Sequence, residues 1–180
     1  MKLINYKEFK SLLENFEPET LRIENLHIDL EEPLSFDLRW QSFYFNNCML
    51  TGERLDFYIN QKNDNEYQSI QFVDCSVSND LYIKDCQLHT VEFRDVEITS
   101  KSFHITTSEI KSISITGSPN KHNTINSLVL HDLNDLTPNF DFRLNNIDEF
   151  HINNCSFNKV MMNGNNIKKL NFEQLNCISY

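Results

Sequence analysis

Apolar and polar positions follow one another along this chain in a recurring unit of ten residues. The unit reads apolar-x-apolar-x-x-small/apolar-x-apolar, and Ile70, Phe72, Cys75 and Val77 form one copy. Short units that recur in this way predict a solenoid, because each unit buries its apolar side chains only by stacking on its neighbours. Further copies of the unit begin at Leu81, Val91, Phe150, Val160 and Leu170.

The spacing within the unit predicts how the chain bends. Side chains alternate along a strand, so the first and third positions of a unit share one face. The next apolar position is the sixth, and a straight strand would point it away from that face. One bend between two short strands restores it to the same interior. We therefore predict an all-β fold, a parallel β-helix with two units in each coil of about 20 residues, and roughly seven coils.

The N-terminal stretch has a helical rather than a strand-like period. Pro18 follows it and should end the helix. We expect a single domain in which residues 1–18 form an N-terminal α-helical cap and residues 19–180 form the coils. The last coil carries no comparable cap, and an exposed strand edge recruits other chains, which predicts a homodimer through the C-terminal coil. The apolar face of the helix is predicted to hold Phe9, Leu12, Leu13 and Phe16.

The last thirty residues keep a strict five-residue step, as in Asn154-Cys155-Ser156-Phe157. This pattern resembles the pentapeptide-repeat family. The resemblance implies a right-handed, four-sided β-helix in which a small residue and a Leu or Phe two places later point inward. Bulky residues such as Ile70, Leu81 and Phe150 stand where that family has small ones, and they would widen the coil. Some members of the family mimic duplex DNA and bind DNA gyrase.

Charge restricts the partners that the protein can have. The formal net charge is −10, which argues against direct binding of nucleic acid, because that requires a basic surface. The charge is uneven: residues 1–99 hold 19 acidic and 9 basic side chains, whereas residues 100–180 hold 7 of each. An acidic N-terminal half favours a partner that is itself basic.

Further features predict a cytoplasmic, bacterial protein without a membrane segment. The start of the chain has no apolar stretch typical of a secretory signal, and no segment is apolar over the length that a bilayer requires. The chain has 5 cysteines, an odd number that agrees with a reducing compartment. Most of them occupy the inward corner position of a unit, where cysteine serves as a small buried apolar residue: Cys48, Cys75, Cys86 and Cys155.

Catalytic and metal-binding motifs are not found in the sequence. The 6 histidines are scattered, with His104 and His151 at outward positions of their units, and no nucleophile elbow, zinc motif or phosphate-binding glycine loop occurs. We therefore expect a protein that is not an enzyme and that uses no metal and no cofactor.

The sequence favours a binding protein that neutralises a basic protein partner. Within this class we favour an immunity protein or antitoxin that inhibits a cognate bacterial toxin, such as a nuclease with a basic groove. Two alternatives stay open: a pentapeptide-repeat-like DNA mimic that modulates DNA gyrase, and a structural solenoid that assembles end to end. The predicted contact residues are Glu31, Glu32, Asp37, Glu53, Asp56, Asp64 and Glu66, with Tyr44 and Tyr58 as aromatic anchors.

Overall fold

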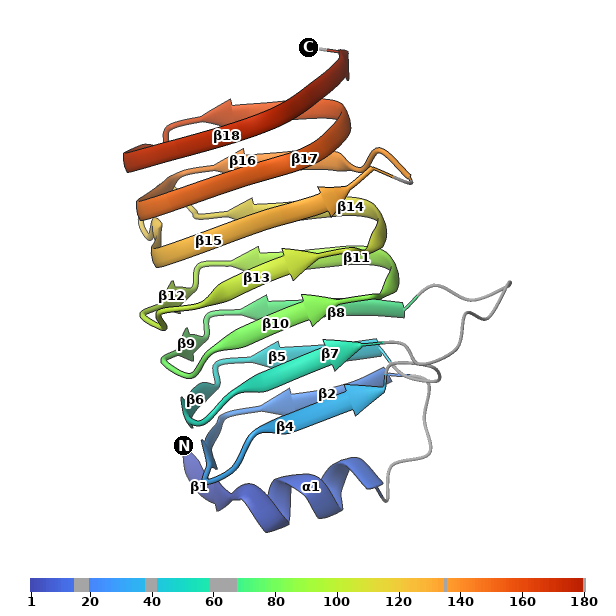
Figure 1. The fold of residues 1–180 in the computed structure, drawn as a ribbon. Helices are drawn as coiled ribbons and strands as arrows, with labels where there is room; N and C mark the ends of the chain where they lie inside the picture. Colours follow the sequence, from blue (N-terminus) through green and yellow to red (C-terminus); the bar gives the residue numbers. More distant parts are fainter. Residues whose placement is uncertain (15–19, 38–41, 59–67, 135, 180) are drawn as a thin grey trace.

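The repeated apolar positions wind the chain into a parallel β-solenoid of about seven turns (Figure 1). The computed structural model describes residues 1–14, 20–37, 42–58, 68–134 and 136–179. The N-terminus and the C-terminal strand lie at opposite ends of the stack. The prediction of an all-β solenoid with an N-terminal helical cap is therefore confirmed.

Three sets of strands stack along the solenoid, each with parallel pairing. The rear face in Figure 1 consists of β2 (Thr20–Glu24), β5 (Ser42–Asn46), β8 (Gln68–Val73), β11 (Gln87–Arg94), β14 (Glu109–Thr116) and β16 (Asn139–Arg143). The front face consists of β4 (Leu34–Asp37), β7 (Leu55–Tyr58), β10 (Leu81–Lys84), β13 (Phe103–Thr106), β15 (Asn123–Leu133), β17 (Asn145–Asn163) and β18 (Asn166–Ser179). A narrow side consists of β1 (Lys2–Asn5), β3 (Leu26–Leu30), β6 (Met49–Gly52), β9 (Ser76–Val77) and β12 (Glu97–Ile98).

The interior is a set of side-chain columns. Phe45, Phe72 and Phe93 stack with nearly parallel rings, at centroid distances of 4.5 and 5.0 Å. Phe93 pairs in register with Phe72 below it and Ile115 above it, so one turn takes 21 or 22 residues here. Like residues in register give each turn the same interior neighbours, and the predicted coil length is confirmed.

Corners between the rear face and the narrow side use left-handed backbone. Asn25, Asn47, Asp74 and Asp95 stand at this corner in successive turns, with φ between 51° and 58°. Asn and Asp tolerate this conformation better than other residues with a Cβ atom, which explains why they recur there. The Asn47 side-chain amide also donates a hydrogen bond of 2.7 Å to Asn25 Oδ1, so the corner residues stack as well.

The first turn is covered by α1 (Tyr6–Glu14). The helix begins with a reciprocal capping box: the Glu8 N–H donates to Asn5 Oδ1 (3.0 Å), and the Asn5 N–H donates to Glu8 Oε2 (3.1 Å). Phe9 and Leu13 are buried, which confirms the predicted apolar face, whereas Phe16 lies outside the described residues. Residues 2–5, which we assigned to the cap, instead form β1, which pairs with β3.

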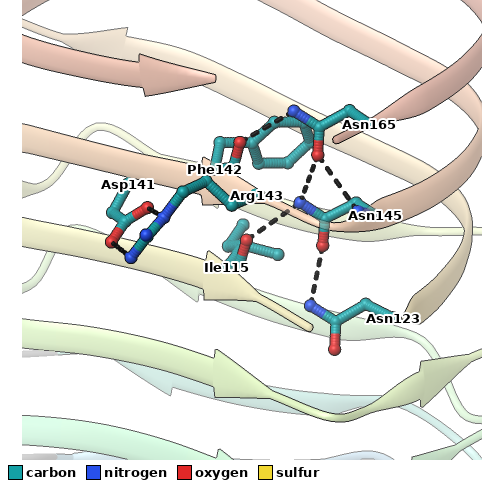
Figure 2. A network of polar contacts seen from close by, with 7 residues as sticks. All are labelled: Ile115, Asn123, Asp141, Phe142, Arg143, Asn145 and Asn165. Atoms are coloured by element: carbon teal, nitrogen blue, oxygen red, sulfur yellow. Dashed lines mark hydrogen bonds and ion pairs between the residues drawn. The ribbon is translucent and has the colours of Figure 1, made fainter. Parts of the chain in front are cut away.

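An asparagine ladder replaces the apolar inward corner in the upper turns (Figure 2). Lower turns place Cys48, Cys75 and Val96 in this column. Above them the Asn123 amide donates to Asn145 Oδ1 (2.7 Å), and the Asn145 amide donates to Asn165 Oδ1 (2.9 Å) and to Ile115 O (2.9 Å). The side chains of Asn123 and Asn145 are fully buried, so these bonds satisfy amides that water cannot reach.

The other end of the solenoid leaves its interior side chains open. On β18 the inward Leu170 and Phe172 are 44% and 61% exposed, whereas their counterparts Phe150 and Ile152 one turn below are buried. The homodimer contact that we expect at this end stays a prediction.

We predict that Asn145→Ala lowers the free energy of unfolding by about 2–3 kcal/mol, because it leaves buried ladder partners without hydrogen bonds. Urea unfolding followed by circular dichroism measures this. The matched control is Asn166→Ala, because Asn166 is exposed on the same side of the turn above. Equal stability of the two variants would contradict the role given to the ladder.

We also predict that Asn47→Val lowers stability by about 1–2 kcal/mol, because a β-branched residue is strained in left-handed backbone. Its neighbour Asn46, in the extended β5, provides the control: Asn46→Val should change stability by less than about 0.5 kcal/mol. Thermal unfolding of both variants tests whether the corner or the strand sets the preference.

Candidate functional site

The outer surface of the front face presents two columns of side chains, one residue from each strand in each column. The first column is Ser35, Asp56, Tyr82, His104, Val129, His151 and Asn171. The second column includes Asp37 and Tyr58 in the lower turns, and Lys84, Thr106, His131, Asn153 and Glu173 above. Because parallel register fixes both columns, residues from distant parts of the sequence become neighbours.

The upper half of these columns borders a groove of about 870 Å³, which we call the histidine groove. Strands β13, β15, β17 and β18 line it. Its polar lining residues are His104, Thr106, Ser127, His131, His151, Asn153, Asn171 and Glu173, and its apolar lining residues are Val129, Ile152, Leu170 and Phe172. A volume of this size falls within the range of ligand-binding clefts.

The histidines of the groove influence one another. The ring of His104 stacks on Tyr82 at 4.9 Å. Burial lowers the pKa of His104; the charge of Asp80 opposes this shift, and those of His131 and His151 add to it. Each of the other two has a carboxylate beside it: His131 Nε2 lies 3.4 Å from Asp132 Oδ2, and His151 Nε2 lies 3.4 Å from Glu149 Oε2.

The rim carboxylate Glu149 joins the groove to its edge. Its contact with His151 and the ion pair with Lys169 (3.3 Å) both lower the pKa of Glu149. The Asn171 amide lies 3.3 Å from His151 Nδ1, on the other side of the imidazole. Hydrogen-bonding groups therefore surround the His151 ring and hold its orientation.

Sequence reasoning did not find this groove. His104 and His151 both occupy the second position of their units, so their equal phase was the available signal. Loops of unequal length separate the turns, however, and the register of His131 with Thr106 and Asn153 depends on those lengths.

The structure brings several of the predicted contact residues together at the lower end of the front face. Glu31, Glu32 and Glu53 are exposed in the turns that lead into β4 and β7, and we call these three residues the acidic corner. The Glu53 N–H donates to Leu30 O (2.7 Å), which holds the two turns side by side.

Other predicted contact residues lie elsewhere. Asp37 and Tyr58 pair in register on the front face, next to the acidic corner in the chain. Tyr44 lies on the rear face, where the guanidinium of Arg22 sits 5.2 Å from its ring centroid. Asp64 and Glu66 lie outside the described residues.

Asp56 corrects the expectation of an exposed carboxylate, because it is only 2% exposed. It occupies an outward strand position, but the side chains of Arg54 and Lys84 approach it, with nitrogen–oxygen distances of 3.1 and 3.9 Å. The Ser35 hydroxyl donates a further hydrogen bond of 3.1 Å to the same oxygen. The cationic neighbours neutralise Asp56, so it adds little negative charge to the surface.

Charges on the rear face are also paired. Arg143 makes a two-pronged ion pair with Asp141 on β16 (Figure 2), and Arg94 lies 3.7 Å from Glu92 on β11. Uncompensated carboxylates therefore gather at the acidic corner rather than along the whole solenoid.

The inward cysteines are confirmed as core residues. Cys48, Cys75, Cys86 and Cys155 are buried and unbridged. Burial raises the pKa of Cys86 and raises that of Cys155 to about 11, whereas a hydrogen bond with Cys48 together with burial raises that of Cys75. Within the described part of the chain, no group of three or more His, Cys, Asp or Glu side chains is arranged to hold a metal ion.

Comparison with known proteins yields no relative for this chain. Neither a family model, nor a curated protein, nor a solved structure matches it. Among the described residues, no helix combines the length and apolar character that crossing a bilayer demands. The fold and the side chains on its faces are therefore the evidence for a function.

We predict that a thiol reagent added to the folded protein at about pH 8 labels Cys177 first. Cys177 is half-buried, whereas burial keeps the other four thiols protonated and covered. Mass spectrometry of peptides after alkylation locates the label. Labelling of Cys86 at the same rate as Cys177 would contradict the burial described here.

Proposed function

We propose that this protein is a non-catalytic binding protein of the bacterial cytoplasm that neutralises a basic protein partner, and specifically an immunity protein or antitoxin. The observation that carries the proposal is the acidic corner, where Glu31, Glu32 and Glu53 stand exposed beside the front face. A surface of this kind attracts a cationic partner at long range and speeds its capture.

The front face supports the proposal by its rigidity. Stacked strands hold Asp37 and Tyr58 in fixed register beside the acidic corner. Tyr58 is half-buried, so it can present its ring edge and hydroxyl without reorganisation of the backbone. Tyrosine in such a setting is a common source of binding energy in protein interfaces.

We also propose a relation to pentapeptide-repeat proteins for the upper turns. Phe150 pairs with Leu170 and Ile152 pairs with Phe172, which gives the last turn the 20 residues of four pentapeptides. A DNA mimic that modulates gyrase is the weaker functional candidate, because Arg94 and Arg143 stand among the carboxylates of the rear face. A mimic of a phosphate backbone needs uninterrupted negative charge.

A growth-rescue experiment tests the proposal. The genes adjacent to the one that encodes this chain are expressed singly in a bacterial host, and we expect one of them to be toxic and to encode a basic protein. Co-expression of this chain should restore growth. The triple variant E31K/E32K/E53K should lose the rescue and lower the affinity for the purified toxin by about 100-fold or more, because three attractions become repulsions.

The matched control is E14K/E24K/E97K, which changes the net charge equally at exposed positions outside the acidic corner. This variant should rescue growth as the native chain does. Equal loss of rescue by both triples would show a general charge effect, and full rescue by E31K/E32K/E53K would refute the acidic corner as the docking surface. Inhibition of gyrase supercoiling by the chain, with no toxin rescue, would favour the DNA-mimic alternative.

A further inference from the structure

We infer that the histidine groove binds a lysine or arginine side chain from an extended segment of the partner, and that acidification releases it. This inference rests on the proposed function, because it adds a second contact to the same basic partner. The groove lies higher on the front face than the acidic corner, so a partner aligned along the solenoid can reach both.

The lining of the groove has the chemistry of a cation acceptor. Of the described residues that line it, none is a lysine or arginine, and Glu173 brings a carboxylate. Thr106, Asn153 and the neutral imidazoles add oxygen and nitrogen atoms that accept hydrogen bonds. Because the chain as a whole carries a net charge of −10, its field also favours a cationic ligand over an anionic one.

The nearby cations are already neutralised. Lys169, at the rim, pairs with Glu149 at 3.3 Å, and Lys84 lies 3.9 Å from Asp56. The front face also shows how such a cation can sit on it: the guanidinium of Arg54 lies 5.7 Å from the ring centroid of Tyr82, whose other neighbour is His104. An incoming guanidinium can use the imidazole surfaces in the same way.

Acidification converts the acceptors into cations. A neutral imidazole offers one accepting nitrogen, whereas the protonated ring only donates and repels a cation. His131 and His151 face Asp132 and Glu149, which favour their charged forms, and Glu173 and Lys169 face them from β18. His104 faces Asp80, Tyr82 and Lys84, and its burial keeps it neutral to lower pH than an exposed histidine. The charge of the groove therefore rises as the pH falls through the range near 6.5.

The test uses two short, otherwise identical peptides, one with arginine and lysine and one with glutamate at the same positions. Binding is followed by nuclear magnetic resonance of the histidine rings of the full chain. We expect the basic peptide to shift the signals of His104, His131 and His151, with His27, His89 and His122 as internal controls outside the groove. Affinity should fall about tenfold or more between about pH 7.5 and pH 5.5.

Variants separate the groove from general charge. H131Q/H151Q keeps hydrogen-bond acceptors but cannot become charged, so it should bind at neutral pH and lose most of the dependence on pH. E173K should weaken binding of the basic peptide by about tenfold. Glu97→Lys, on the narrow side, makes the same charge change outside the groove and should have no such effect.

Several results would overturn the inference. Binding of the glutamate peptide with the same affinity would do so, as would a pH profile that H131Q/H151Q leaves unchanged. Absence of shifts at the groove histidines would also do so. If toxin rescue depends on the acidic corner while E173K and H131Q/H151Q bind the toxin as the native chain does at both pH values, the proposed function stands and the groove inference fails.

Discussion

The whole molecule depends on the return of the chain, turn after turn, to the same interior. Each corner must bend the backbone sharply without pointing an apolar side chain outward, and left-handed residues such as Asn47 and Asp74 accomplish this. Once the corners are in place, in-register stacking buries one apolar residue against its counterpart in the next turn. The phenylalanine stack of Phe45, Phe72 and Phe93 is the clearest product of that constraint.

The same constraint organises polar residues. A position that points outward in one turn points outward in the next, so polar groups form columns as regular as the core. Inward polar groups obey it too: Asn123 and Asn145 are tolerated in the interior because the ladder supplies each amide with partners from the turns above and below. Asp56 shows the outward case, where Arg54 and Lys84 compensate a buried carboxylate.

Much of this architecture could be predicted from the spacing of apolar residues. The unit that holds Ile70, Phe72, Cys75 and Val77 has one solution in which all four side chains are buried, and the structure adopts it. The strand at residues 2–5 was missed because it precedes the first recognisable unit and pairs with β3 across the whole of α1. Burial of Asp56 was missed because it depends on neighbours that a periodic pattern does not reveal.

The histidine groove was beyond sequence reasoning for a related reason. Its side chains come from turns whose lengths differ, as the offsets of 22 residues from Phe93 to Ile115 and 27 from Ile115 to Phe142 show. A single residue more in any loop would shift the upper turns and separate His131 from His104. The fold thus supplies a rigid ruler, and loop lengths decide which side chains meet on it. A binding surface on such a scaffold needs no change in the core, so partner choice can reside wholly in the outward columns.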